Sequence, residues 1–205
     1  MTKLAFVFPG QGSQKPGMGQ ELAEAFGVAR EVFEAVDDAL DQHLSRLMFN
    51  GPAEELTLTA NAQPALMAVS LAVTEVLRRE MGIDICSKAS LVAGHSLGEY
   101  SAAAAVGVFD IGQTAKLLRL RGETMQAAVP PGEGAMAAIL GLELDAVTDL
   151  VSEASGDDVL AVANDNAPGQ VVVSGHVAAV DRAIALAKDK GAKRALPLPV
   201  SAPFH

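Results

Sequence analysis

The sequence has 205 residues, of which 50% are hydrophobic, 20% are charged and 4% are aromatic. A chain of this length and composition buries most of its apolar surface, which argues against intrinsic disorder, and its core is expected to consist of Ala, Val and Leu. The formal net charge of −10 repels phosphates and anionic lipids, so we expect neither nucleic-acid binding nor membrane binding.

Cys86 is the single cysteine, so no intrachain disulfide can form and a cytoplasmic location is expected. The apolar run at residues 4–8 is too short for a secretory signal peptide. Elsewhere no run reaches the roughly 18 consecutive apolar residues that a membrane helix needs.

The first elements in chain order are a strand, a loop and two helices. Residues 4–8 form a continuous apolar run, which predicts a strand buried on both faces, as in parallel sheets. Residues 9–19 are rich in Gly and predict a loop. Helical periodicity follows over residues 21–47 and 63–81, with Pro64 suited to the first turn of the second helix.

A strand, a turn and a helix follow. Residues 89–93 predict a second strand, and the alanine-rich residues 99–106 predict a helix. A further helix over residues 111–129 ends at Pro130-Pro131-Gly132, the strongest break in the chain.

Shorter units follow that break. They are predicted strands at 134–141, 160–163, 170–174 and 193–200, and predicted helices at 144–154 and 177–190. The order βαββαβ is the ferredoxin-like arrangement. We therefore predict an α/β protein in which a small ferredoxin-like subdomain, residues 131–199, is inserted in a large α/β-hydrolase-like domain formed by residues 1–130 and 200–205. That large domain has a parallel sheet.

Gly94-His95-Ser96-Leu97-Gly98 matches G-x-S-x-G, the nucleophile elbow, in which a sharp strand-to-helix turn exposes the serine hydroxyl. A side chain at either glycine would crowd that turn. The strand and the helix are predicted independently of the serine, and together they favour Ser96 as a nucleophile.

A serine nucleophile needs a base within hydrogen-bond reach, and there are four histidines. His95 projects differently from the turn, His43 suits a solvated helix face, and His176 suits a surface position at a helix start. Spacing alone prefers none of the four, although His205 follows the small subdomain and re-enters the domain that carries Ser96.

Several motifs, in order along the whole chain, resemble malonyl-CoA:acyl carrier protein transacylases. They are Phe8 to Gln14, Gly51 to Leu56, Thr59 to Leu66, Gly94 to Tyr100, Arg121-Gly122 with Met125-Gln126, Asn166 to Val172, and Gly191 to Ser201 ending in Pro203-Phe204-His205. The resemblance implies an acyltransferase of fatty acid synthesis.

The resemblance assigns roles to individual positions. It implies that Ser96 is acylated, that His205 is the base, and that the backbone N–H groups of Gln11 and Leu97 form the oxyanion hole. It also implies that Arg121 holds the malonyl carboxylate, although the helix around it would otherwise suggest a surface residue. A planar guanidinium is the natural partner of a carboxylate in an apolar acyl pocket.

Four further residues are implied to bind substrate: Gln63, Met125, Asn166 and Phe204. The implied reaction is a ping-pong exchange of a malonyl group between malonyl-CoA and the phosphopantetheine thiol of acyl carrier protein. No bound cofactor is expected, and no Cys/His cluster in the sequence suggests a metal.

The expected partners are malonyl-CoA, or free CoA, and acyl carrier protein, bound by a monomer. Carrier proteins are acidic, so an enzyme with a charge of −10 needs a local basic site. One candidate is the cluster of Lys188, Lys190, Lys193 and Arg194, and the other is Lys116 with Arg119.

Two alternatives remain open. A serine hydrolase or thioesterase would use the same serine and histidine, and a noncatalytic module would dock carrier protein without turnover.

Members of the family that the motifs resemble continue beyond the position of His205, and their later residues supply further sheet strands and orient the base. We therefore expect a truncated chain with exposed sheet edges, low stability and little activity by itself.

Overall fold

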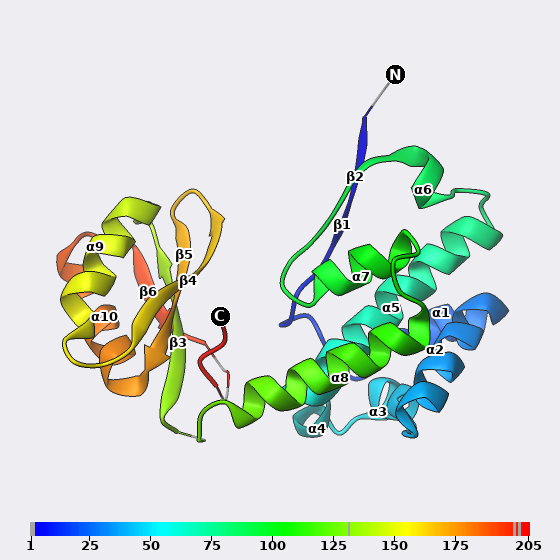
Figure 1. Cartoon of the computed structure of the whole chain (residues 1–205), viewed down its shortest axis with the longest axis horizontal. Helices are drawn as coiled ribbons and strands as arrows, with labels where there is room; N and C mark the ends of the chain where they lie inside the picture. Colours follow the sequence, from blue (N-terminus) through cyan, green and yellow to red (C-terminus); the bar gives the residue numbers. More distant parts are fainter. Residues whose placement is uncertain (1–2, 131, 199, 201) are drawn as a thin grey trace. The chain divides into compact units, whose positions relative to one another are not determined.

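The computed structural model describes residues 3–130, 132–198, 200 and 202–205. The chain divides into two compact units, Met1–Thr124 (unit 1) and Met125–His205 (unit 2), and each is described by itself (Figure 1). The predicted subdomain boundaries at residues 131 and 199 lie outside the described residues, as do Pro131 of the predicted break and Ser201 of the last motif. The predicted domain division stays a prediction.

Unit 1 contains a parallel pair of strands, β1 (Leu4–Phe8) and β2 (Ala89–Gly94). Both strands were predicted from their apolar runs. Phe8 is aligned with Gly94 at the carboxyl ends of the strands, so the loop after β1 and the turn after β2 begin at the same edge of the sheet.

The two faces of this pair differ, because alternate side chains of a strand point to opposite faces. Phe8 is buried in a cluster with Ile85 and Ala102. The other face carries Val7, which is 74% exposed, and Leu91, which is 61% exposed. The prediction that residues 4–8 are buried on both faces is therefore wrong: in the described part of the chain, one face of the pair is open to solvent.

Residues 20–50 form three helices where one was predicted over 21–47. They are α1 (Gln20–Ala25), α2 (Gly27–Leu40) and α3 (Leu44–Asn50). Phe26 has an extended backbone and ends α1, and Asp41 adopts a left-handed conformation, φ 48°, and ends α2. Apolar periodicity continues across both breaks because all three helices bury one stripe in the same core.

The central helix of unit 1 is α5 (Thr59–Arg79), which follows the short α4 (Ala53–Thr57). It begins four residues before the predicted start, so Pro64 lies in its second turn rather than its first. Helices α2 and α4 pack against α5, and its first two turns are buried almost throughout. The N-terminal end of α5 therefore lies inside unit 1.

The remaining helices of unit 1 are α6 (Ile85–Lys88), α7 (Gly98–Ala105) and α8 (Ile111–Ala127), the last of which extends into unit 2. Helices α7 and α8 lie within two residues of their predicted bounds. Helix α7 packs against both strands and against α5. Across the described residues, no helix is both long enough and apolar enough to cross a bilayer.

Unit 2 has the predicted order βαββαβ. Its elements are β3 (Gly134–Leu140), α9 (Leu144–Ser155), β4 (Leu160–Ala167), β5 (Gln170–His176), α10 (Val177–Asp189) and β6 (Arg194–Pro197). The strands form an antiparallel sheet in the order β4-β5-β3-β6. Together with the parallel pair of unit 1, this makes the chain a mixed α/β protein.

Both faces of the unit 2 sheet are covered, because alternate residues of its central strands face two different clusters. Ile139 and Val173 pack with α9 and α10 on one face. Met136 and Val172 pack with Phe204 on the other. The last residues of the chain are thus held against the sheet of unit 2.

Candidate active site

Ser96 lies in a tight turn between β2 and α7, as the elbow motif predicts. Its backbone is left-handed, φ 54°, a conformation that costs a non-glycine residue about 1–2 kcal/mol. A Cβ at Gly94 would lie 1.9 Å from the carbonyl carbon of Gly98, and one at Gly98 would lie 2.4 Å from the Phe8 oxygen. Both glycines are therefore required by close backbone contacts inside the turn.

The loop after β1 lies beside this turn. The His95 N–H donates a hydrogen bond of 3.0 Å to the Phe8 carbonyl oxygen. A Cβ at Gly10 would lie 2.3 Å from Nδ1 of His95, so the loop passes directly against that ring. Gln11 follows Gly10, and the turn of Ser96 and Leu97 and the loop of Gln11 are thereby packed together within unit 1.

Arg121, on α8, contacts Ser96. Its Nη2 donates a 3.0 Å hydrogen bond to Ser96 Oγ, and its Nη1 donates one of 2.6 Å to Oε1 of Gln63. The guanidinium carbon also lies 5.8 Å from the centre of the Tyr100 ring, within cation–π range. The planar fork is thus oriented by three neighbours, with one edge directed at the serine oxygen.

Gly122 explains why α8 can bring Arg121 so close to α5. A Cβ at Gly122 would lie 2.7 Å from the Cα of Ala60 and 2.7 Å from the carbonyl oxygen of Thr59. Only a residue without a side chain permits this approach of helix to backbone. In the Arg121-Gly122 pair, the glycine makes the close contact that positions the arginine beside it.

Two further hydrogen bonds connect Gln63, and through it Arg121, to the loop of Gln11. Gln63 Nε2 donates to Thr59 Oγ1 over 3.0 Å, and the Thr59 hydroxyl donates to Gln11 Oε1 over 3.0 Å. Thr59 was not predicted as a site residue. The helix was expected to begin at residue 63, so nothing placed Thr59 one turn before Gln63. A Thr and a Gln four residues apart in one buried turn would have been the signal.

The remaining predicted site residues belong to unit 2. Phe204 is buried against the sheet, and Met125 packs against the same cluster. Asn166, on β4, and His205 are exposed. A Cβ at Gly134 would lie 2.2 Å from the Pro203 ring, so the glycine at the start of β3 makes room for the segment that leads to His205. The structure therefore brings Met125 and Phe204 together in unit 2.

Two other histidines, His176 and His43, lie at the surface near the ends of helices. His176 lies at the start of α10, where its Nδ1 is 3.1 Å from a carboxylate oxygen of Asp158. The His43 side chain is 88% exposed, in the link between α2 and α3. Both side chains are exposed, as expected, but His43 lies in a link between helices and not on the expected helix face.

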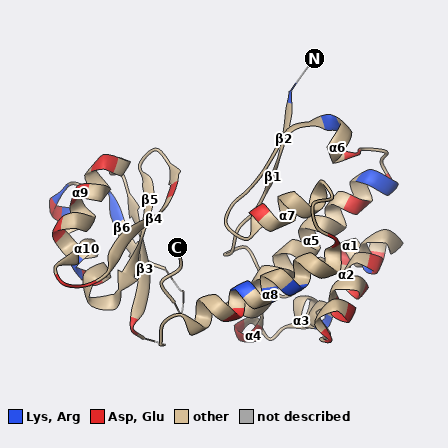
Figure 2. Ribbon diagram, viewed as in Figure 1, with Lys and Arg blue, Asp and Glu red and all other residues tan. Residues whose placement is uncertain are grey.

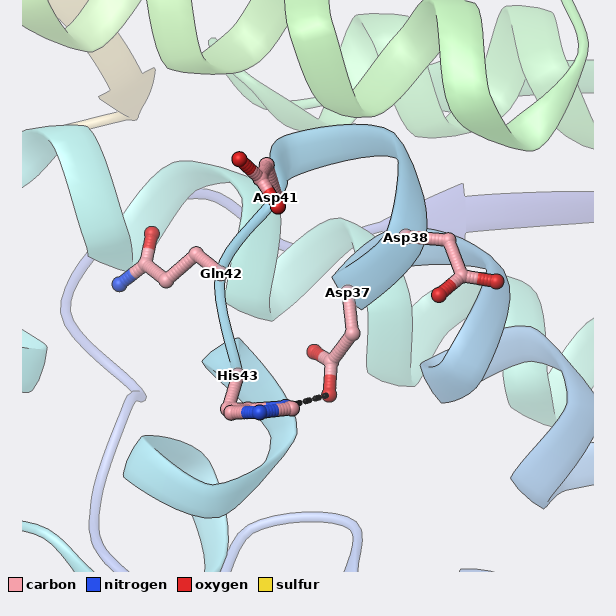
Figure 3. A pocket seen from close by; sticks show the side chains of 5 residues that line it. All are labelled: Asp37, Asp38, Asp41, Gln42 and His43. Atoms are coloured by element: carbon pink, nitrogen blue, oxygen red, sulfur yellow. Dashed lines mark ion pairs between the residues drawn. The ribbon is translucent and has the colours of Figure 1, made fainter.

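A hollow of about 250 Å³ lies beside His43, lined by Asp37, Asp38, Asp41, Gln42 and His43 (Figure 3). Asp37 accepts hydrogen bonds there from the N–H of Ser45, 2.8 Å, and from its hydroxyl, 2.6 Å. This carboxylate therefore caps the start of α3. Among the described residues, no group of three or more His, Cys, Asp or Glu side chains could hold a metal ion.

Comparison with known proteins identifies the family of this chain. The sequence matches the acyl transferase domain family over residues 5–205. The chain belongs to this family. The acyl transferase fold accounts for the combination of a parallel sheet in unit 1 with a separate antiparallel sheet in unit 2.

Individual acyl transferases are closely similar. The malonyl CoA-acyl carrier protein transacylase of Bacillus subtilis is 52% identical over 208 residues, which cover 100% of this chain and 63% of the relative. The crystal structure of the acyl-carrier-protein S-malonyltransferase of Bartonella henselae superposes with a TM-score of 0.96 at 55% identity, over 100% of this chain and 65% of that one.

A third solved acyl transferase is a malonyl-transacylase in complex with a type II PKS acyl-carrier protein. It superposes with a TM-score of 0.94 at 46% identity, over 98% of this chain and 64% of that one. The chain thus spans 63–65% of the length of these three proteins.

Proposed function

We propose that this chain carries the nucleophile of a malonyltransferase that moves malonyl groups from malonyl-CoA to acyl carrier protein in fatty acid synthesis. The observation that carries the proposal is the guanidinium edge of Arg121, 3.0 Å from the oxygen of a strained serine. A cation beside a nucleophile selects an acyl group with a negative charge near its reacting carbonyl. A malonyl group has that charge, and the printed names of the relatives support the same substrate.

In the first proposed step, Ser96 Oγ attacks the thioester carbonyl carbon of malonyl-CoA. His205 accepts the hydroxyl proton, and the oxyanion is held by the N–H groups of Gln11 and Leu97. The C–S bond then breaks, CoA leaves as the thiol with that proton, and a malonyl-serine ester remains. Arg121 holds the malonyl carboxylate throughout this step.

In the second proposed step, the phosphopantetheine thiol of the carrier protein attacks the ester carbonyl. His205 takes the thiol proton and returns it to Ser96 Oγ as the C–O bond breaks. The charges that develop are met by side chains and N–H groups of the protein, so the exchange requires no cofactor. A complex between a related transacylase and a carrier protein supports this partner.

Substrate selection is proposed to involve Gln63, which orients the Arg121 fork, and Met125, Asn166 and Phe204 of unit 2. Met125 and Phe204 pack against one apolar cluster, which suits them to line an acyl pocket. Asn166 is exposed on β4, where a side-chain amide can meet the polar part of a substrate.

We also propose a fold assignment for each of the two units. The strand-turn-helix around Ser96 supports an α/β-hydrolase-like core, and the sheet order β4-β5-β3-β6 supports a ferredoxin-like small subdomain. The domain division at residues 131–199, the monomeric state and the cytoplasmic location stay predictions from the sequence.

Carrier protein is proposed to dock at the basic end of α10 and the turn into β6 (Figure 2, where Lys and Arg are blue). Lys188, Lys193 and Arg194 are exposed there, and Lys190 pairs with Glu153 at 2.7 Å. The alternative site is less suited, because the Arg119 guanidinium is taken up by Gln42 and Asn61 in unit 1.

The decisive experiment is intact-protein mass spectrometry after exposure to malonyl-CoA. The expected result is one malonyl group on the wild type and none on Ser96→Ala. The adduct should persist in buffer and disappear when carrier protein with its phosphopantetheine arm is added. Steady release of free malonate without carrier protein would instead select the hydrolase, and no adduct with carrier protein still bound would select the docking module.

A further inference from the structure

We propose that Thr59 is a positioning residue that couples the loop of Gln11 to Arg121, so that the oxyanion side and the carboxylate side of the site are held by one hydroxyl. This inference rests on the proposed malonyl transfer. It assigns a role to a residue that makes no contact with the reacting atoms in the proposed mechanism.

The coupling consists of four consecutive hydrogen bonds within unit 1. Arg121 Nη2 donates to Ser96 Oγ over 3.0 Å, and Arg121 Nη1 donates to Gln63 Oε1 over 2.6 Å. Gln63 Nε2 donates to Thr59 Oγ1 over 3.0 Å, and Thr59 Oγ1 donates to Gln11 Oε1 over 3.0 Å. Thr59 is 2% exposed and Gln63 is fully buried. Water therefore does not compete for the bond between these two side chains, and that bond is costly to break without a replacement.

The direction of each bond is dictated by Arg121, because a guanidinium only donates. Gln63 must therefore present its oxygen to Arg121 and its NH₂ group to Thr59. The Thr59 oxygen accepts that bond, and its single proton is then directed to the oxygen of Gln11. A hydroxyl is the smallest side-chain group that can accept on one side and donate on the other.

The local fold explains why residue 59 holds this position. Thr59 is the first residue of α5, and Gln63 lies one turn later on the same side of the helix. The close approach of Gly122 to the Thr59 carbonyl brings α8, and hence Arg121, alongside that turn. One end of a buried helix thus meets both the loop and α8.

Comparing two acyl groups, malonyl and acetyl, distinguishes the proposed positioning role of Thr59 from a purely structural role. Every thioester needs the oxyanion hole, but only malonyl needs Arg121. Loss of the Thr59 hydroxyl should therefore slow acylation of Ser96 by acetyl-CoA about 10-fold, through the loop, and acylation by malonyl-CoA about 100-fold, through the loop and Arg121 together. The malonyl-to-acetyl ratio should fall about 10-fold.

The test compares Thr59→Val, which keeps the shape but loses the hydroxyl, with Thr59→Ser, which keeps the hydroxyl. Single-turnover acylation of Ser96 is measured with both CoA esters, and thermal unfolding is recorded for each variant. Thr59→Ser should restore the malonyl-to-acetyl ratio. Gln11→Met keeps the backbone N–H but removes the oxygen that Thr59 binds, and it should slow both esters equally, by about 10-fold.

The outcomes are distinct. An unchanged ratio in Thr59→Val, or a ratio in Thr59→Ser as low as in Thr59→Val, would overturn the role of Thr59. If Thr59→Val does not fold, Gln11→Met decides, and wild-type rates in that variant overturn the coupling. A wild type that malonyl-CoA does not acylate on Ser96 would overturn the proposed function itself, and with it the inference that rests on it.

Discussion

Arg121 Nη2 donates a 3.0 Å hydrogen bond to Ser96 Oγ. The same Nη2 is the group that a malonyl carboxylate would approach in the proposed reaction. In the proposed reaction a malonyl carboxylate would replace the serine oxygen on this nitrogen, so we expect a charged acyl group to be favoured over a neutral one.

Replacement of Arg121 should change acyl selectivity rather than abolish acylation. We expect Arg121→Ala to slow malonyl transfer to Ser96 by about 100- to 1,000-fold, because a carboxylate then enters an apolar site unpaired. Acetyl transfer should be retained. Arg121→Lys should recover little, since an ammonium cannot bond Gln63 and a carboxylate in one plane. Acylation rates with both CoA esters check this, and equal losses for the two would contradict it.

Gly122→Ala should destabilise unit 1 and misplace Arg121. The added Cβ meets the backbone of Thr59 and Ala60 at 2.7 Å, and the helices must separate at a cost of about 1–3 kcal/mol in the free energy of unfolding. Gly112→Ala is the matched control on the same helix, because its Cβ meets its nearest atom, the Ala39 Cβ, only at 3.4 Å. Denaturant unfolding of both variants measures the difference, and equal stabilities would be inconsistent with the close contact.

The strained backbone of Ser96 predicts a stability difference between two inactive variants. Ser96→Ala removes the hydroxyl but keeps a Cβ at φ 54°, whereas Ser96→Gly removes the strain. We expect the glycine variant to be more stable than the alanine variant by about 1 kcal/mol. Chemical denaturation decides the order, and the reverse order would show that the turn stores no strain.

Asp158 should stabilise unit 2 in a pH-dependent way. Hydrogen bonds from Arg182 and then His176 lower the pKa of its carboxyl group. The stabilisation is present above the pKa of the unfolded chain and is lost as the pH falls through the lower, folded pKa. Asp158→Asn should therefore melt earlier than the wild type at neutral pH and converge with it in acid.

Asp157→Asn removes the same charge one residue earlier and serves as the control for the Asp158 variant. Melting temperatures at a series of pH values make the comparison. A gap between wild type and Asp158→Asn that persists at the acid end would mean that the carboxylate charge is not what stabilises unit 2.

Charge reversal at the end of α10 should affect carrier protein and leave malonyl-CoA unaffected. The double variant Lys188→Glu with Lys193→Glu is expected to raise the KM for carrier protein about 10-fold at low salt, because like charges then face an acidic partner. Lys116→Glu, on α8, is the comparison. A larger effect of Lys116→Glu would place docking on unit 1.

The order of the elements in unit 2 could be predicted from the sequence, because Gly, Pro and polar residues separate most of its apolar segments. The end of β4 could not, since this strand runs to Ala167, four residues beyond its predicted end. The segment 20–50 could not, since Phe26 and Asp41 interrupt the helix without interrupting its apolar stripe. Where a helix breaks in this segment depends on long-range packing, which the local apolar periodicity of the sequence does not reveal.

The residues of the candidate site differ in how well the sequence alone predicts them. The turn of Ser96 has a motif with a steric basis, and Gly94 and Gly98 make the contacts that this basis requires. The role of Arg121 came from family resemblance, because the contact of α8 with α5 has no signature in the sequence of α8 except Gly122. Thr59 was missed because α5 was predicted to begin at residue 63, and because its other partner, Gln11, is 48 residues away in the sequence.

The open face of the β1 and β2 pair has a practical consequence. Val7 and Leu91 present aliphatic side chains to water on one face of this two-stranded pair. Such a ribbon is a template on which a second copy can stack or pair. A preparation should therefore aggregate faster as its concentration rises, and lysine at position 7 or 91 should slow this aggregation without disturbing the serine turn at the end of the same strands.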